Sequence, residues 1–260
     1  MSNSLGQYNS KWAIIGGTVA FLFLYIPLIV VILFSFNESR VGVNWTGFTF
    51  KWYKILFADK DLIAAALNSL LIALISSAVS VVLGTLAGVA LSKYKVPLLS
   101  ILIMIPIAAP ELLVGVALLL FFILINFTLG ITSIILAHIA FCISFVAISV
   151  KTRMYGLDES IIDAARDLGA SPFKAFYLIL IPSIMPGIIA GGLMAFTLSI
   201  DDFVITFFTA GLGSTTLPLA IYAMLKMGVT PEVNAASTMI IVVTLALTTL
   251  ASKISPQLFR

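Results

Sequence analysis

Charged residues are scarce in this sequence, and their scarcity limits its class before any motif is considered. Lys, Arg, Asp and Glu make up 10% of the 260 residues, against about 25% in a soluble globular domain. Apolar residues make up 61%, and the mean hydropathy is +1.19. This composition indicates an all-α polytopic membrane protein. The formal net charge of +3 is too small to indicate a nucleic-acid partner.

Cysteine and histidine occur once each, as Cys142 and His138. A single cysteine excludes an intrachain disulfide, and one His with one Cys makes no metal site. The sequence also lacks the G-x-x-x-x-G-K phosphate-binding pattern, so the chain is not expected to hydrolyse ATP. We therefore expect a non-enzymatic chain with no metal or cofactor of its own. We interpret His138 as a hydrogen-bonded packing residue.

Long apolar runs fill most of the sequence, and six of them are near or above the roughly 20 residues needed to span a bilayer. The predicted spanning helices are 12–35, 66–92, 98–124, 131–150, 183–209 and 233–253. A signal peptide would have a shorter apolar core and a small-residue cleavage site. We therefore expect the first run to be retained as a helix.

Basic residues in the connections favour one orientation in the membrane. With six spans, one side carries Lys11, Lys93, Lys95, Lys151, Arg153, Arg166, Lys174, Lys253 and Arg260. The opposite side carries Arg40, Lys51, Lys54, Lys60 and Lys226. The positive-inside rule therefore predicts that both termini lie in the cytosol.

The third run contains two prolines and an acid in the stretch MIPIAAPELLVG. Pro106 and Pro110 each lack a backbone donor, and a membrane tolerates the freed carbonyls only where other groups or water satisfy them. Glu111 beside this break favours a water-lined region. A plain kink with a paired structural Glu is the alternative.

The connection at 157–182 is too long for a simple link and contains its own helix signals. Asp158 fits an N-cap, and Gly169 fits the left-handed residue that ends a helix. Ser171-Pro172 then fits the start of a second helix, which we expect to run to the end of the segment. An amphipathic hairpin resting on lipid would favour a basic polar face. Here acids and bases are mixed, which favours a protein partner.

The same segment carries a spaced pattern that resembles the cytosolic signature of permeases from bacterial ATP-binding-cassette (ABC) importers. That signature is Glu-Ala-Ala, three residues, Gly, nine residues and Ile-x-Leu-Pro. The present sequence has Asp163-Ala164-Ala165, then Gly169, then Ile179-Leu180-Ile181-Pro182. Asp163 and Ile181 depart from the signature but keep its charge and its apolar character.

This resemblance implies a type I ABC importer permease fold. The whole chain, 1–260, would be one transmembrane permease domain, with 157–182 as its coupling-helix loop. In that family the short cytosolic helix docks into a groove on a separate ATPase subunit, which binds ATP and Mg and drives alternating access. The coupling residues implied by the match are Asp163, Ala164, Ala165, Arg166, Gly169 and Pro182.

Three further segments resemble the permeases of spermidine/putrescine importers, most closely the C-type subunit. They are Tyr25–Arg40, Phe196–Phe208 and Thr216–Ala235. The resemblance implies polyamine import across the bacterial plasma (inner) membrane. The implied partners are a sister permease, two ATPase subunits and an extracytoplasmic polyamine-binding protein, besides membrane lipid.

Two other functions stay open at this point. Related permeases carry other solutes, such as organic cations, opines or iron complexes, so the cargo is less secure than the class. A secondary transporter or channel predicts internal repeats or a ring of charges. The sequence shows no internal repeat, and that reading leaves the helix predicted after Asp158 without a role.

The predicted spans contain only three acids, Glu111, Asp201 and Asp202, and no Lys or Arg lies inside a span to pair with them. A carboxylate in hydrocarbon is costly and should meet a cation or a proton. At a rise of 1.5 Å per residue, Glu111 lies about 20 Å and Asp201 about 27 Å from the cytosolic edge. Both are expected in the outer half of the bilayer, where ammonium groups of a polyamine would first be received.

Helical spacing distinguishes the two aspartates. Asp202 shares a stripe of small and polar residues with Ser199 and Thr206, whereas Asp201 lies to one side. The predicted substrate pathway comprises Glu111, Asp201, Asp202, Ser199 and Thr206. We expect Asp202 to contact the cation and Asp201 to cap or support the helix. Structural pairing across the subunit interface is the alternative for either aspartate.

Overall fold

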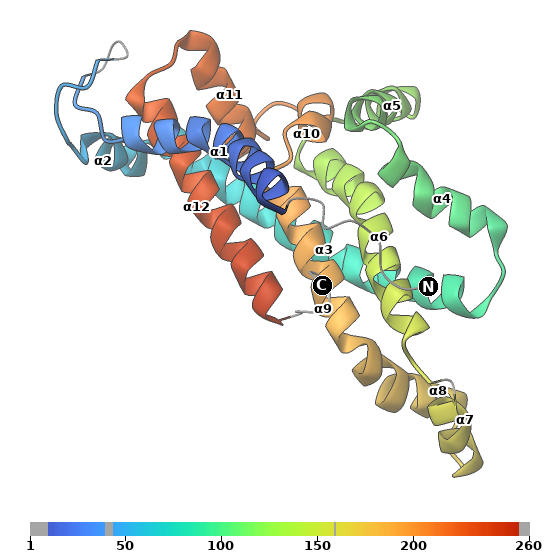
Figure 1. The fold of residues 1–260 in the computed structure, drawn as a ribbon. Coiled ribbons are helices and arrows are strands. Elements are labelled where there is room, and N and C mark those ends of the chain that lie inside the picture. Colours follow the sequence, from blue (N-terminus) through green and yellow to red (C-terminus); the bar gives the residue numbers. More distant parts are fainter. Residues whose placement is uncertain (1–9, 40–43, 159, 255–260) are drawn as a thin grey trace. The chain divides into compact units, whose positions relative to one another are not determined.

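The computed structural model describes residues 10–39, 44–158 and 160–254. The regular secondary structure in this part of the chain is helical, apart from one isolated β-bridge between Asn37 and Phe48 (Figure 1). Arg40 and Arg260, which the charge comparison uses, lie outside these residues. The helices are α1 (Ser10–Phe34), α2 (Lys51–Ala58), α3 (Lys60–Lys93), α4 (Pro97–Ala108), α5 (Glu111–Leu124), α6 (Ile131–Tyr155), α7 (Ser160–Asp167), α8 (Pro172–Ala175), the π-helical turn η1 (Phe176–Leu180), α9 (Ile181–Ile200), α10 (Val204–Thr209), α11 (Leu217–Met227) and α12 (Pro231–Ile254).

The chain packs as two compact units. One combines the described residues up to Asp59 with Met224–Ile240, and the other combines Lys60–Ala223 with the described residues from Ile241 onward. In the first unit, the Trp52 indole is buried and donates its Nε1–H to the Asn37 carbonyl oxygen at 2.6 Å. The second unit contains every residue that the sequence singles out for transport and coupling.

Three long helices, α3, α6 and α9, form the centre of the second unit (Figure 1). They approach closely because α3 and α9 present glycines to α6. A Cβ added at Gly84 would lie 2.6 Å from the Cβ of Val146, and one at Gly191 would lie 2.9 Å from its Cα. Gly84 and Gly191 belong to two stretches with small residues four positions apart, Gly84–Gly88 and Gly187–Gly191. Both glycines meet α6 at Val146, so that no larger side chain fits between the helices.

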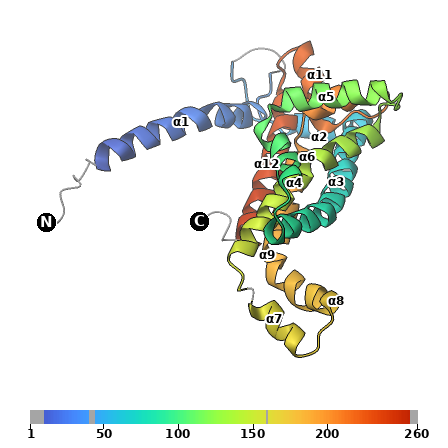
Figure 2. The same ribbon diagram turned by 90° about the vertical axis from the view of Figure 1, so that its right-hand side faces the viewer.

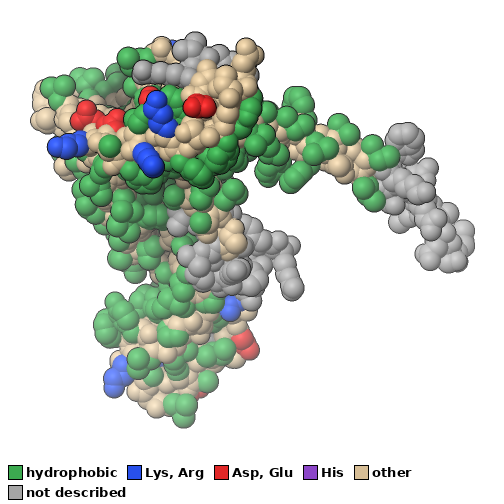
Figure 3. All heavy atoms as spheres, turned by 90° about the vertical axis from the view of Figure 1, so that its left-hand side faces the viewer, with side chains coloured by type: hydrophobic (Ala, Val, Ile, Leu, Met, Phe, Trp, Pro, Cys, Tyr) green, Lys and Arg blue, Asp and Glu red, His purple; other side chains and the backbone are tan. Residues whose placement is uncertain are grey.

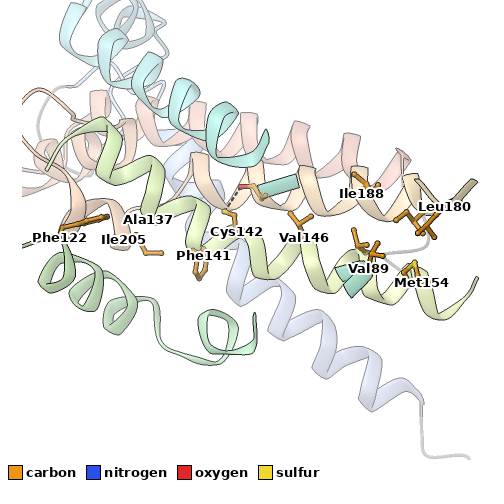
Figure 4. Close-up of a cluster of buried hydrophobic side chains, with 13 residues drawn as sticks. Val89, Phe122, Ala137, Phe141, Cys142, Val146, Met154, Leu180, Ile188 and Ile205 are labelled. Carbon is orange, nitrogen blue, oxygen red and sulfur yellow. Dashed lines mark hydrogen bonds between the residues drawn. The ribbon is translucent and has the colours of Figure 1, made fainter. Parts of the chain in front are cut away.

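Apolar side chains fill the space around this three-helix centre (Figure 4). Phe141, Cys142 and Val146 of α6 lie in this cluster, with Phe122 from α5 and Ile205 from α10. The Cys142 thiol donates a hydrogen bond to the Ala195 carbonyl oxygen at 3.5 Å. Cys142 thus behaves as a buried packing residue that ties α6 to α9.

Membrane-spanning character is clear from length and composition. Within the described residues, four helical segments are each long and apolar enough to cross a membrane, and the pair α4 and α5 brings the number to five if it counts as one bent span. The four are Ile14–Phe34, Lys60–Lys93, Ile131–Tyr155 and Pro172–Ile200. Figure 3 shows hydrophobic side chains over most of the surface that faces the viewer, with charged side chains gathered in a few places. The predicted all-helical membrane fold is confirmed.

The interruption expected in the third span is confirmed, and the fifth span, which was expected to be continuous, is broken as well. The predicted helix 98–124 is two helices, α4 and α5, which meet at an angle of 114°. Ala109 is extended, with φ −80° and ψ 141°, because the ring of Pro110 disfavours helical backbone at the preceding residue. The predicted helix 183–209 is likewise broken between Ile200 and Val204. In α12, the apolar part within the described residues, Pro231–Ala246, is also shorter than a full span.

The connection between α6 and α9 forms the predicted helical hairpin, which extends beyond the ends of these two helices (Figure 2). Asp158 Oδ1 accepts a hydrogen bond from the Ser160 backbone N–H at 3.0 Å, and hydrogen bonds from Ser160 hold the pKa of Asp158 below its ordinary value. Gly169 has a φ of +87°, and Ser171 Oγ accepts from the Lys174 backbone N–H at 3.3 Å. All three predicted helix signals are confirmed.

The sequence suggested that the second helix of this hairpin ends at Pro182, but in the structure the helix continues past this residue. The π-helical turn η1 leads from α8 directly into α9, and the Ile181 N–H bonds to the Phe176 carbonyl oxygen. Pro182 lies in the first turn of α9, directly after the π-helical turn, so its missing donor falls where the hydrogen-bond pattern changes from π-helical to α-helical. The coupling loop is thus joined to a spanning helix without a break in the helical backbone.

Candidate functional site

Two broken helices meet at one place in the second unit. Helix α5 begins at Glu111, directly after the Pro110 break, and packs against α10, which begins after the Asp201–Phe203 break. Their close approach depends on Gly115: a Cβ there would lie 2.7 Å from the Phe208 ring and 3.4 Å from the Ile205 Cα. Breaks in spanning helices occur where the freed backbone lines a cavity or meets other polar groups. This junction is therefore the place to look for transport chemistry.

Asp202 supplies the polar groups that the second break needs. Its Oδ2 accepts hydrogen bonds from the backbone N–H and the Oγ1–H of Thr206, each at 2.7 Å. Its Oδ1 accepts from the Ile205 backbone N–H at 3.4 Å. These N–H groups have no partner within α10 because they lie in its first turn. Asp202 thus serves as the cap of α10.

His138 of α6 is the partner of this carboxylate. Its Nε2 lies 3.3 Å from Asp202 Oδ2 and 3.0 Å from Thr206 Oγ1, and its Nδ1 lies 2.7 Å from Ser199 Oγ. The side chains of His138 and Asp202 are 2% and 8% exposed. With Nε2–H donating to the carboxylate, the neutral ring is left with Nδ1 to accept from the Ser199 hydroxyl. One imidazole thereby connects α6, α9, the break and α10.

The structure corrects the expected division of roles between the two aspartates. Asp202 was expected to contact the cation and Asp201 to cap a helix, but Asp202 caps α10 and is almost fully buried. Asp201 is exposed and lies in the break before α10, the helix against which α5 packs. Glu111 is also exposed, in the first turn of α5. Of the three acids, Glu111 and Asp201 are therefore the pair available to a ligand.

Ser199 and Thr206 lie beside Asp202, as the helical stripe predicted. Both are buried, at 5% and 0% exposure, and the hydroxyl oxygen of each lies within hydrogen-bond distance of a His138 ring nitrogen. The stripe that was expected to line the substrate pathway is instead an internal hydrogen-bond network. Among the predicted pathway residues, these two and Asp202 form the interior support, and Glu111 and Asp201 form the accessible part.

Aromatic rings begin at the second break, within two residues of Asp201, and no role was predicted from the sequence for Phe203 or Phe207. The rings of Phe203 and Tyr222 are 4.6 Å apart between centroids, and Phe203 and Phe207 are 5.6 Å apart. Phe203 follows Asp201 by two residues, so the cluster begins at the break itself. The face of an aromatic ring attracts cations. The signal was present in the stretch DDFVITFF, where aromatics follow the acids at helical spacing.

The residues predicted to couple the chain to an ATPase lie on and beyond α7. Ala165 is buried against the hairpin, whereas Asp163, Ala164 and Arg166 are exposed. Asp163 and Arg166 line a cavity of about 300 Å³, which also includes Lys93 at the end of α3. The structure thus gathers the residues from Asp163 to Gly169 at one helix. Pro182, by contrast, stands one structural element further on, at the start of α9.

Among the described residues, no group of three or more His, Cys, Asp or Glu side chains is arranged to hold a metal ion. The only histidine and the only cysteine of the chain, His138 and Cys142, are both engaged in hydrogen bonds between helices. The chemistry available at the junction is therefore that of carboxylates and aromatic faces.

A contact at the junction gives the first test of its role. Gly115→Val adds atoms where the α10 backbone and Phe208 leave no space, so α5 must move away from α10. We expect uptake by the assembled transporter to fall about fivefold, because Glu111 then no longer lies beside Asp201. Ala117→Val adds a similar volume at an exposed position of α5 and should leave uptake unchanged. Equal uptake by the two variants would contradict the importance of this contact.

The amino-acid sequence is similar to a family model and to individual proteins, all of which are components of transport systems. The family model of the binding-protein-dependent transport system inner membrane component matches residues 78–256. The chain is 41% identical over 233 residues to the spermidine/putrescine transport system permease protein PotC of Escherichia coli (strain K12), covering 88% of each chain. It is 39% identical over 249 residues to the putrescine transport system permease protein PotI of the same strain, covering 92% of this chain and 89% of the relative.

Comparison with solved structures supports the fold. The chain is similar to a chain of a bacterial ABC transporter involved in the import of the acidic polysaccharide alginate, with a TM-score of 0.69, 16% identity and coverage of 97% and 99% of the two chains. It is also similar to a chain of the MetNI methionine ABC transporter in an inward-facing conformation, with a TM-score of 0.63, 17% identity and coverage of 76% and 96%. At these identities the likeness concerns the fold alone.

Proposed function

The chain belongs to the family of binding-protein-dependent transport system inner membrane components, and from this premise we propose that it is a permease subunit of an ATP-driven importer of spermidine and putrescine. As a member of this family it is a multi-pass inner-membrane subunit without catalytic activity, and ATP is bound by a separate ATPase subunit. The cargo is proposed from the relatives that share about 40% of its residues and from the chemistry of the junction.

The observation that carries the cargo proposal is the accessible acid pair beside the aromatic rings. Polyamines are flexible chains of ammonium groups, which lose hydration on entering a membrane and need carboxylates and aromatic faces in its place. Glu111 and Asp201 are both exposed, and they lie at the two helix breaks that precede α5 and α10, which pack against each other. No Lys or Arg occurs in 97–150 or in 175–225, the stretches that contain the acids and rings. Each carboxylate is thus available for an ammonium group of the cargo.

The proposed assembly pairs this chain with a sister permease, two ATPase subunits and an extracytoplasmic polyamine-binding protein. The positive-inside count places both termini and α7 in the cytosol. We propose that α7 docks on one ATPase through the side chains of Asp163, Ala164 and Arg166 and the backbone at Ala165. Gly169 ends this helix. Closure of the ATPases would then move α7, and η1 and Pro182 would transmit the movement to α9. The membrane helices would thereby alternate between outward- and inward-facing states.

Reconstitution tests this proposal directly. The chain, its sister permease and the ATPase are placed in nanodiscs, and binding protein loaded with spermidine or putrescine is added. We expect ATP hydrolysis to rise severalfold over the rate with unloaded binding protein. A response to another solute with none to either polyamine would overturn the cargo. Cargo flux through the chain alone, without ATP, would overturn the class.

A further inference from the structure

A single buried imidazole holds together the second helix break. His138 contacts Ser199 at the end of α9, Asp202 within the break and Thr206 in α10, at 2.7, 3.3 and 3.0 Å. These residues come from segments more than 60 positions away in sequence. Each of the three is buried, so water does not replace the imidazole as their partner. Among the described residues of α6, His138 is thus the only one whose side chain forms hydrogen bonds on both sides of the break.

The break needs such a partner because its carboxylate is buried. A carboxylate away from water is costly unless hydrogen bonds satisfy it. Asp202 accepts hydrogen bonds from Thr206 and Ile205, but these donors belong to the helix that it caps and move with it. The imidazole belongs to α6, which packs along both α3 and α9. His138 therefore fixes the break to the centre of the unit, which the cap alone does not do.

The orientation of the neighbouring residue depends on this attachment. If 200–203 continued α9 as a regular helix, residue 201 would lie one turn beyond Thr197 and Leu198, on a partly buried face. Leu198 packs against the apolar core cluster. In the broken form Asp202 is held inward and Asp201 is exposed instead. The interior network thus decides whether the carboxylate of Asp201 is accessible.

We infer that His138 is a positioning residue for cation recognition: by holding Ser199, Asp202 and Thr206 from α6, it keeps the α9–α10 break open so that Asp201 is presented beside Glu111. The identity of the cation rests on the proposed function, but the positioning itself does not. His138 does not touch the cargo in this account. Its effect on transport passes through Asp201.

Two variants of His138 and one matched control isolate this effect. His138→Phe fills the space but removes all three polar contacts. His138→Gln keeps an amide that can donate to Asp202, so it is expected to recover most of the lost function. Ser149→Ala is the control, because Ser149 is also buried on α6 and donates to the Gly187 carbonyl oxygen of α9 at 2.9 Å, away from the break.

The first readout is a double-mutant cycle on uptake by the reconstituted complex. We expect His138→Phe to lower uptake about fivefold in the native background and less than twofold in an Asp201→Asn background. Ser149→Ala should have the same effect in both backgrounds. Residues that do not contact each other normally act independently, so equal factors for His138→Phe in both backgrounds would overturn the positioning role.

The second readout needs no cargo and so separates this inference from the proposed function. In a Cys142→Ala background, the thiol of Asp201→Cys is labelled with a cationic methanethiosulfonate reagent. We expect His138→Phe to slow the labelling at least fivefold, and Ser149→Ala to leave it unchanged. Labelling of Leu212→Cys, at a fully exposed position, serves as the reference. An unchanged rate at position 201 would overturn the inference even if polyamine uptake is observed, and a slowed rate would support it even if the cargo proves to be another solute.

Discussion

Replacing Asp202 with alanine is expected to prevent assembly of a stable transporter, whereas replacing its neighbour Asp201 is expected to spare assembly and abolish most uptake. Asp202→Ala removes the cap of α10, which costs about 1–2 kcal/mol. It also leaves the buried hydrogen-bonding groups of His138 and Thr206 short of a partner, at about 1–3 kcal/mol. The sum, about 2–5 kcal/mol, is a large share of the stability of a typical domain.

The Asp201→Ala variant is the matched control, since it removes the same side chain one residue earlier. Asp201 is exposed, and the hydrogen bonds that the structure gives to this break go to Asp202. We therefore expect its complex to be recovered at the native level and to unfold at the native temperature. Uptake should fall at least tenfold, because one of the two accessible carboxylates is missing.

Recovery of the complex from detergent extracts and its thermal unfolding measure the first effect, and uptake per recovered complex measures the second. Native stability of Asp202→Ala would show that the network around His138 contributes little. Native uptake by Asp201→Ala would remove Asp201 from the substrate pathway. The two results are independent, because one concerns the interior of the junction and the other its accessible side.

Local sequence signals predicted those parts of the fold that depend on neighbouring residues. The coupling hairpin is the clearest case: Asp158, Gly169 and Ser171 each act on backbone within five residues of themselves, and each has the predicted role. Apolar runs likewise predicted the long helices, because length and composition alone decide whether a segment can span a bilayer.

The breaks in the spans were harder to predict, because apolar composition continues through them. Pro110 indicated the first break, because proline disfavours helical backbone at the preceding residue. The second has no proline, and its cause is a side chain that caps α10 from within the apolar run. Asp202 followed by apolar residues fits a helix N-cap as well as it fits an acid inside a span. Only the structure, in which Ile205 and Thr206 donate to it, distinguishes the two readings.

The partner of Asp202 could not be found from spacing. His138 and Asp202 are 64 positions apart, and their contact depends on how α6 packs against α9 and α10. The sequence showed that no Lys or Arg was available inside the spans and so suggested a cation in transit as the partner. The imidazole of His138 contacts the same carboxylate, with Nε2 3.3 Å from Asp202 Oδ2. The acid that needed a partner therefore already has one, and the ligand role that we propose at this junction belongs to Asp201.

Gly169→Val is expected to separate ATP hydrolysis from transport. Gly169 follows α7 with φ +87°, a conformation that costs a residue with a side chain about 1–2 kcal/mol and a β-branched residue more. At this position the Gly169 N–H bonds to the Arg166 carbonyl oxygen at 2.9 Å, and the Ala170 N–H bonds to that of Ala165 at 3.0 Å. These two bonds form the Schellman closure of α7. Valine would open it and unwind the last turn of an eight-residue helix.

That last turn contains Ala165 and Arg166, which belong to the proposed docking surface for the ATPase. We expect the number of cargo molecules moved per ATP to fall about tenfold or more in Gly169→Val. No atom lies within 4 Å of a Cβ built at Gly169, so steric clash would not cause the loss of coupling. Substitutions at this position therefore differ in how well each residue tolerates the backbone conformation. Gly169→Asn is therefore the control, since asparagine tolerates a positive φ. It should keep the ratio within about twofold of native. If Gly169→Asn lost coupling as completely as Gly169→Val, the side chain rather than the backbone would be responsible; if both kept it, α7 would not be the element through which the ATPase acts.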